Sequence, residues 1–325
     1  YAGSPQYGME FRPYFLAQRW VKAGHHVTIV ASAYSHLRTK NPDLKGQPYL
    51  DERVDGIRWF WIAGPQYHGN GMGRIRNILS FLHGVNHYLL DICAVGKPDV
   101  VIASSTYPLD IYPAKKIAKR YGAKIIYEVH DLWPLSPMEL GGMSKHHPFI
   151  MIMQKGENEC CKSADAVVSL LPCAREHFIE HGMAPEKFHY VPNGIVAADW
   201  EKPLPEHPVY EAKAAEIAPN NVELLDPISR AQVPEFLHQM DALYIGLQRQ
   251  PLFRFGVSPN KLMDYMRAGK PVIFAIEAGN DMVAEARCGI SIPPEDSRAI
   301  ADAARKLASM PPQELAEMGM RGHQY

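Results

Sequence analysis

The chain has 325 residues, enough for two α/β domains that each bury their own core. Hydrophobic residues make up 46%, charged residues 21%, and the formal net charge is −1, so a role in coating nucleic acid is not expected. There is no apolar run long enough to span a membrane, and the five scattered cysteines include no C-x-x-C pair. We therefore expect reduced thiols in a cytosolic protein, without disulfides or a zinc site.

Strand and helix patterns alternate through the first half of the chain. Apolar periodicity predicts a doubly wound parallel sheet with helices on both faces. The predicted strands are 25–32, 54–64, 98–104, 123–131, 164–171 and 188–194. The predicted helices are 8–24, 74–96, 112–122, 150–163 and 173–182.

The second half repeats the alternation in a smaller domain. Strands are predicted at 222–228, 241–247, 271–276 and 289–296, and helices at 230–240, just after Ser258-Pro259, and at 297–310. We place the domain boundary between 190 and 191. No strand precedes the first helix, and residues 201–220 are polar and rich in proline. We therefore expect further natural residues before Tyr1, near Tyr210 and Glu211, and after Tyr325; a second domain with fewer strands is the alternative.

The stretch "FGVSPNKLMDYMRAGKPVI" joins two predicted strands through a loop and a helix. Ligands of open parallel sheets bind beyond the carboxyl ends of strands, where loops meet helix N-termini. Ser258 or Asn260 can cap this helix, and Lys261 adds a positive charge for a phosphate. Asp264, one turn further, can accept hydrogen bonds from the vicinal hydroxyls of a ribose. A capped surface helix with an exposed acid is the alternative interpretation.

Other candidate residues lie just after strands or before helices. His130 and Asp131 follow a buried strand, where an imidazole can bind a substrate hydroxyl or move a proton and the acid can orient it. Gly8 precedes a helix, so its N–H can approach an anion, and Arg12 lies one turn in. Arg74 and Arg76 follow a glycine-rich loop that can meet an anionic acceptor. For each candidate, a purely structural role is the alternative.

Nucleophile-elbow, zinc-protease and Walker A motifs are absent from the sequence.

Three longer segments together resemble the retaining glycosyltransferases of family four. These segments are "YGMEFRPYFLAQRWVKAGHHVTIVAS", "SADAVVSLLP" with "FHYVPNG", and "SPNKLMDYMRAGKPVI". The resemblance covers nearly the whole chain and implies the GT-B fold, with two facing Rossmann-like domains. In detail, "EVHDLWPLSP" and "HYVPNGI" are similar to bacterial transferases of O-antigen and exopolysaccharide assembly, including N-acetyl-L-fucosaminyltransferases.

The resemblance implies roles for individual residues. His130 matches a histidine that contacts the donor sugar and is needed for transfer. Asp264 matches the second of two glutamates that flank the sugar nucleotide, whereas the first falls on Gly256. Gly8 matches the second glycine of an N-terminal Gly-Gly loop. Donor binding is thus expected to involve Asp264, Lys261, Asn260, Ser258, Gly8, Asn193 and Gly194, with Arg12, Arg74 and Arg76 as acceptor or phosphate contacts.

The implied reaction transfers a sugar from a UDP-sugar to a polyprenyl-diphosphate-linked acceptor. It needs no metal or other cofactor, because helix dipoles and basic side chains neutralise the leaving diphosphate. The protein is expected in the cytoplasm, peripheral to the inner face of the membrane, with helix 74–92 as a candidate contact. A nucleotide-sugar 2-epimerase and a non-catalytic nucleotide-sugar-binding subunit are the alternatives.

Overall fold

The computed structural model describes residues 2–8, 11–67, 69, 71–197, 200–201 and 228–325. The chain divides into two compact units. Unit 1 runs to Ser169 and includes Arg175–Val191; unit 2 comprises Leu170–Ala174 and the residues from Pro192 onward. The strand predicted at 222–228 and the expected discontinuity near Tyr210 and Glu211 lie almost wholly outside the described residues. Within those residues, no helix is both long and apolar enough to cross a bilayer.

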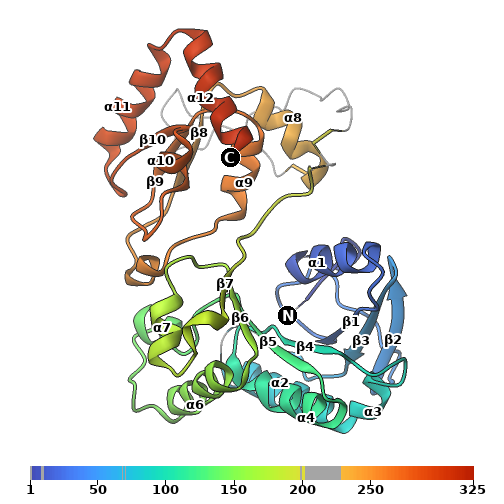
Figure 1. The fold of residues 1–325 in the computed structure, drawn as a ribbon. Helices are drawn as coiled ribbons and strands as arrows, with labels where there is room; N and C mark the ends of the chain where they lie inside the picture. Colours follow the sequence, from blue (N-terminus) through green and yellow to red (C-terminus); the bar gives the residue numbers. More distant parts are fainter. Residues whose placement is uncertain (1, 9–10, 68, 70, 198–199, 202–227) are drawn as a thin grey trace. The chain divides into compact units, whose positions relative to one another are not determined.

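The first sheet of unit 1 has the strand order β1-β3-β2 (Figure 1). Strand β1 (Thr28–Ser32) pairs in parallel with β3 (Ile57–Ile62), and β2 (Tyr49–Val54) pairs antiparallel with β3. Asp55 and Gly56, which join β2 to β3, have φ angles of 52° and 79°, as a two-residue hairpin turn requires. The strand predicted over 54–64 is present as β3, but it starts only at Ile57 because Asp55-Gly56 is a turn, and the antiparallel β2 departs from the expected parallel sheet.

Strand β3 is buried on both faces, and all six of its residues are buried. Trp59 and Trp61 pack with Tyr14 and Ala17 of helix α1 (Phe11–Lys22). Phe60 and Ile62 face the opposite way, toward α2 (Met72–His87) and α3 (Leu89–Ile92). This alternation follows from the two-residue period of a strand. The single helix predicted over 74–96 is interrupted at Tyr88.

The second sheet of unit 1 is fully parallel, as predicted, with the order β4-β5-β6-β7. Its strands are β4 (Val100–Ala103), β5 (Lys124–Val129), β6 (Ala166–Ser169) and β7 (Phe188–Tyr190). The helices between them are η1 (Pro108–Asp110), α4 (Ile111–Tyr121), α5 (Leu135–Glu139), α6 (Pro148–Ser163), α7 (Arg175–Glu180) and η2 (Pro185–Lys187).

The described residues of unit 2 form a parallel sheet with the order β10-β9-β8. Its strands are β8 (Leu243–Gly246), β9 (Val272–Ala275) and β10 (Gly289–Ser291). Its helices are η4 (Arg230–Gln232), α8 (Val233–His238), η5 (Pro251–Phe255), α9 (Asn260–Arg267), α10 (Met282–Ala286), α11 (Ser297–Ala308) and α12 (Pro312–Gln324). A Cβ on Gly319 of α12 would lie 1.9 Å from the carbonyl oxygen of Gly269. The glycine is thus needed for the close approach of α12 to Gly269, two residues after the end of α9.

Candidate functional site

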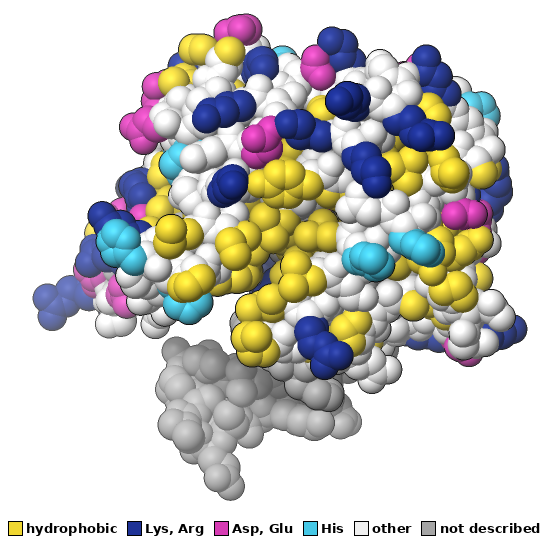
Figure 2. All heavy atoms as spheres, turned by 90° about the horizontal axis from the view of Figure 1, so that it is seen from below, with side chains coloured by type: hydrophobic (Ala, Val, Ile, Leu, Met, Phe, Trp, Pro, Cys, Tyr) yellow, Lys and Arg dark blue, Asp and Glu magenta, His cyan; other side chains and the backbone are white. Residues whose placement is uncertain are grey.

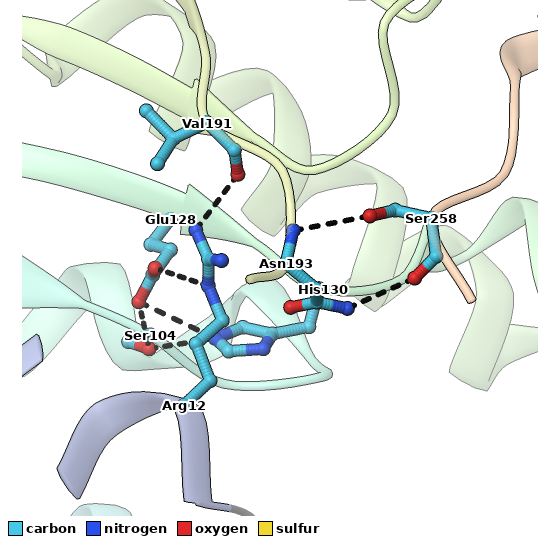
Figure 3. Close-up of polar contacts among 7 residues, drawn as sticks. All are labelled: Arg12, Ser104, Glu128, His130, Val191, Asn193 and Ser258. Carbon is cyan, nitrogen blue, oxygen red and sulfur yellow. Dashed lines mark hydrogen bonds and ion pairs between the residues drawn. The ribbon is translucent and has the colours of Figure 1, made fainter. Parts of the chain in front are cut away.

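In unit 1, three polar side chains meet at the carboxyl edge of the parallel sheet. Ser104 directly follows β4, and His130 directly follows β5. The two strands are neighbours, with Ala103 opposite Tyr127, so both strand ends reach the same edge. Glu128 lies two residues before His130 and therefore points to the same side. Figure 3 shows these three side chains turned toward one another.

Glu128 is a buried carboxylate with partners on both oxygens. Oε1 accepts a hydrogen bond from Arg12 Nε at 3.0 Å, and Oε2 accepts one from Ser104 Oγ at 2.6 Å. The His130 Nε2 atom lies 3.3 Å from Oε2. Burial alone would raise the pKa of Glu128, but the interactions with His130, Ser104 and Arg12 outweigh it and lower the pKa to about 2. The group is therefore a fixed negative charge at neutral pH.

These contacts fix the ring of His130. The single hydroxyl proton of Ser104 is donated to Glu128, so the Ser104 oxygen accepts from His130 Nε2, at 2.9 Å. Nε2 therefore carries a proton. Nδ1 has no hydrogen-bond partner within the described part of the chain, and the side chain is 16% exposed. His130 thus keeps one ring nitrogen for a ligand.

Asp131 does not orient His130 in the way that the structural alternative for His130 would have it. Its carboxylate accepts hydrogen bonds from Trp133 Nε1, at 3.0 Å, and from the Ser136 hydroxyl. Glu128 takes the orienting role instead. Strand geometry explains the difference, because adjacent residues face opposite sides whereas alternate residues share a side.

Arg12 connects helix α1 to this cluster. Besides its ion pair with Glu128, its NH2 group donates to the carbonyl oxygen of Val191 at 2.9 Å. The guanidinium predicted to contact an acceptor or phosphate is thus engaged by protein oxygens. Gly8, near the start of the chain, has a φ of 75°, and its N–H donates to Ser4 O rather than projecting as a free anion donor.

The other two predicted arginines lie on α2. The Arg74 guanidinium lies over the ring of Trp133, 5.3 Å from its centroid. Arg76 is exposed. Neither residue has a hydrogen bond to His130 or Glu128 among the contacts that the structure describes.

In unit 2, the loop before α9 is held by two asparagine side chains. The Asn280 carboxamide accepts from Val257 N at 2.7 Å and donates to Val257 O at 3.1 Å. Asn193 donates its backbone N–H to Ser258 Oγ and its side-chain N–H to Ser258 O, both at 3.0 Å. Figure 3 shows the second pair of contacts. Each asparagine therefore forms two hydrogen bonds with a single loop residue.

Ser258 and Asn260 do not cap α9, contrary to the prediction. The cap position is Pro259, and among the described residues no side-chain cap hydrogen bond is present. The Ser258 hydroxyl is instead the acceptor of Asn193 N. Ser258 is buried, whereas Asn260 and Lys261 are exposed at the helix start. The N-terminal amides of α9, with their positive dipole end, are thus left without a side-chain acceptor.

Gly256 leaves no space for the side chain that the resemblance places there. Its φ is 91°, and a Cβ would lie 2.6 Å from Pro172 Cδ and 3.0 Å from Asn280 Oδ1. Both the backbone conformation and these contacts exclude an acid. Asp264, by contrast, is present and half-buried on α9. Burial raises its pKa, and the charge of Arg230 opposes that shift. Gly194 is exposed, with open space around its Cα.

Two family models match the chain in succession. Residues 8–194 match the glycosyl transferase 4-like domain, and residues 195–310 match the glycosyl transferases of group 1. The first match alone covers more than half of the chain. The chain belongs to the glycosyl transferase 4-like family.

Three solved structures place this glycosyltransferase in a fold group. Sucrose-phosphate synthase from Thermosynechococcus elongatus has a TM-score of 0.62 and 13% identity over 98% of this chain and 88% of its own. A structure described as trehalose-6-phosphate from E. coli bound with UDP-2-fluoro glucose has a TM-score of 0.65 and 11% identity, and the match covers 100% of this chain and 93% of the other.

The third is trehalose-6-phosphate synthase, from work on glycosyl transfer with retention, with a TM-score of 0.63 and 10% identity over 98% and 93%. These likenesses confirm the predicted GT-B fold of the glycosyltransferase. No curated protein matches its sequence significantly.

Sequence reasoning missed three residues that shape the glycosyltransferase's candidate site. They are Ser104, Glu128 and Asn280. Glu128 had a readable signal, since it is the one acid within the apolar strand "KIIYEV" and lies two residues before His130. Ser104 ends the predicted strand 98–104, but nothing in the sequence joins it to His130, and Asn280 had no signal, because the partners of both residues become neighbours only through the sheet and loop packing.

Replacing Glu128 tests the electrostatics of the cluster. A carboxyl whose pKa is lowered from 4.5 to about 2 on folding stabilises the protein fully above pH 4.5 and loses that contribution as the pH falls toward 2. Glu128→Gln should therefore lower the free energy of unfolding by on the order of 3 kcal/mol at neutral pH. Urea denaturation should show the difference from the wild type shrinking below pH 4.5.

Asp131→Asn is the matched control, because Asp131 is the adjacent acid and contacts Trp133 and Ser136 instead. Asp131→Asn should keep most of the pH-dependent stability that Glu128→Gln loses. If the two variants lose the same stability with the same pH dependence, Glu128 has no special role.

Proposed function

We propose that this glycosyltransferase moves a sugar, an N-acetylated amino sugar, from a UDP-sugar to a lipid-linked saccharide, with retention of the anomeric configuration. The process it serves would be synthesis of a bacterial surface polysaccharide. The observation that carries the proposal is His130, whose Nε2 is held by Ser104 and Glu128 while Nδ1 is left for a substrate. A UDP donor is supported by the similar structure that binds UDP-2-fluoro glucose.

The donor would bind in unit 2 through the start of α9. Its uncapped amide groups and Lys261 offer positive potential to a diphosphate, and Asp264, one turn further, offers two acceptors to the ribose hydroxyls. Gly256 provides no carboxylate for the sugar. The backbone groups of residues 256–258, which the two asparagines hold, would contact the sugar instead.

The proposed chemistry is a front-side displacement that needs no metal. As the bond from the anomeric carbon to the diphosphate oxygen breaks, positive charge develops at that carbon. The acceptor hydroxyl attacks from the same face and gives its proton to the oxygen of the departing diphosphate. A double displacement would need a free carboxylate, but both oxygens of Glu128 are already engaged and its side chain is only 8% exposed. Glu128 therefore orients His130, and His130 Nδ1 contacts a sugar hydroxyl.

A lipid-linked acceptor would bring unit 1 to a membrane surface. On α2, Met72 and Leu79 are 76% and 55% exposed, and on α6 Met151 and Ile152 are 58% and 55% exposed. The two helices are neighbours, because Ile78 and Met153 share one core cluster. Arg76 and Lys155 are exposed beside these apolar residues. Figure 2 views the face that carries α2, α4 and α6, where hydrophobic side chains gather with Lys and Arg around them.

Nucleotide binding is the first property to measure. Among UDP, GDP, ADP and CMP, only UDP should raise the melting temperature of the purified protein, since a ligand of the folded state stabilises it by mass action. Asp264→Ala should require about ten times more UDP for the same rise in melting temperature, because about 1.4 kcal/mol of binding energy is removed. The exposed Asp302→Ala on α11 is the control and should behave as the wild type. Equal shifts with all four nucleotides would contradict the UDP assignment.

The role of His130 separates binding from transfer. His130→Ala should reduce the rate of sugar transfer by at least about 100-fold, the lower range for a positioned acid–base or polar group, while the UDP-induced melting shift stays unchanged. His25→Ala, an exposed histidine in the same unit, should retain full transfer. If His130→Ala loses UDP stabilisation as well as transfer, the residue has a structural role.

A sugar-transfer assay run with and without acceptor decides between the alternative functions. Release of free sugar without any acceptor would indicate a 2-epimerase, and UDP binding with neither transfer nor hydrolysis would indicate a binding subunit. Gly256, in place of an expected acid, is the feature that favours the second alternative.

Membrane contact can be tested with vesicles. The wild type should sediment with vesicles that contain anionic phosphatidylglycerol and less with pure phosphatidylcholine, because apolar insertion and basic residues act together. Met151→Glu with Ile152→Glu should reduce the bound fraction severalfold. Met320→Glu, an exposed methionine of unit 2, is the control. Unchanged sedimentation of the double variant would exclude this surface.

A further inference from the structure

A cluster of metal-ligand side chains lies between α6 and α7 in unit 1. Glu157 comes from α6, His177 from α7, and His181 directly follows α7, one turn after His177. Nε2 of His177 lies 2.8 Å from Glu157 Oε1, and Nε2 of His181 lies 3.8 Å from Glu157 Oε2. One ligand atom from each residue lies within 4.8 Å of the other two. None of these residues belongs to the His130 cluster.

Burial makes this arrangement costly unless its charge is balanced. The side chains of Glu157 and His177 are 1% and 8% exposed, whereas His181 is 25% exposed. A buried carboxylate needs a cation or several hydrogen bonds. His181 provides the edge of the cluster from which a small ion or water can enter.

The neighbours of His181 turn its lone pair toward Glu157. Its Nδ1 lies 3.0 Å from Asn158 Oδ1, an acceptor, and 3.1 Å from Gln154 Nε2, a donor. Because the two hydrogens of Gln154 Nε2 go to its closer acceptors, Glu157 Oε2 and Asn158 Oδ1, Nδ1 carries the ring proton and donates it to Asn158 Oδ1. Gln154 Nε2 donates to both Glu157 Oε2 and Asn158 Oδ1, at 2.8 and 3.0 Å. Nε2 of His181 and Oε2 of Glu157 are then two acceptors 3.8 Å apart, with no proton between them.

That separation suits an ion placed between the two atoms. Zinc bonds to histidine nitrogen and carboxylate oxygen are each about 2.0–2.2 Å long, so two bonds at an open angle span a distance of this size. The hydrogen bond from an outer amide to a liganding histidine is a usual feature of such sites. Cysteine spacing in the sequence predicted no zinc, and these three residues become neighbours only because α7 packs on α6 (Figure 1).

We propose that Glu157, His177 and His181 bind one Zn²⁺ ion, with water as the fourth ligand. Binding through His177 requires its Nε2 to give up the proton it shares with Glu157, while Nδ1 keeps or takes one. The ion joins α6 to α7, and α7 begins the Arg175–Val191 segment that returns to unit 1 after Leu170–Ala174. Its role is to fix this returning segment, which ends at Val191, the carbonyl partner of Arg12.

The test is titration of chelator-treated protein with Zn²⁺ and Co²⁺. The wild type should bind one equivalent of Zn²⁺, show the visible bands of tetrahedral Co²⁺, and gain melting temperature with Zn²⁺. His181→Ala, a change at the partly exposed ligand, should lower zinc affinity by at least about 100-fold. Asn158→Ala removes only the outer hydrogen bond and should lower it by about 10–100-fold.

His83 and His87 provide a matched control, since they form an exposed histidine pair four residues apart on α2, with ring centroids 6.1 Å apart. Replacing both with alanine should leave the tight site unchanged. Circular dichroism establishes that each variant is folded. The proposal is overturned if the wild type binds no zinc at micromolar concentration, if His181→Ala binds it equally well, or if binding disappears with the α2 pair.

Discussion

The buried carboxylate of Glu128 is the interaction on which the candidate site of unit 1 depends. A charge with an 8% exposed side chain must be compensated, and three different parts of the chain supply partners. Arg12 comes from α1, Ser104 from the end of β4, and His130 from the end of β5. Because Arg12 also binds Val191 O, the same carboxylate indirectly holds the end of unit 1's last strand. The orientation of His130 is therefore a consequence of how the buried charge is compensated.

In unit 2, the loop before α9 is held without a charged group. Gly256 has a positive φ and lies against Pro172, so the loop turns where no side chain fits. Asn280 and Asn193 then satisfy the polar groups of Val257 and Ser258. Backbone groups held in this way lose little freedom when a ligand binds, which favours affinity. An acid at position 256 would therefore require a different backbone conformation of the whole loop, which explains why glycine occupies this position.

Sequence patterns predicted the strands of both units wherever apolar runs were bounded by turn residues. The run "PVIFAI" became β9, and 98–104 contains β4. Patterns failed where a local signal had two meanings. Asp55-Gly56 lies next to an apolar stretch whose pattern predicts a strand through it, although it makes the β2–β3 turn. Ser258 has the composition of a helix cap, but its hydroxyl binds Asn193, a partner 65 residues away.

The site was predictable only to the extent that chemistry follows sequence neighbours. His130 could be found because it directly follows a buried strand, but its orienting acid was assigned to Asp131, the adjacent residue, rather than to Glu128 on the same face of the strand. The cluster of Glu157, His177 and His181 could not be found at all, since 20 residues separate Glu157 from His177.

The contacts of Glu128 bear on whether this acid can act as a nucleophile. A carboxylate that attacks the anomeric carbon must be free, whereas the carboxylate nearest His130 is saturated by Arg12 and Ser104. Its negative charge can still act on the imidazole, because together with Ser104 it fixes the Nε2 proton, so that Nδ1 would be the substrate contact in the proposed reaction. The arrangement favours a histidine that positions a sugar hydroxyl while charge develops elsewhere. The proposed retention would then come from the acceptor's approach on the face that the leaving diphosphate vacates, without a covalent intermediate on this acid.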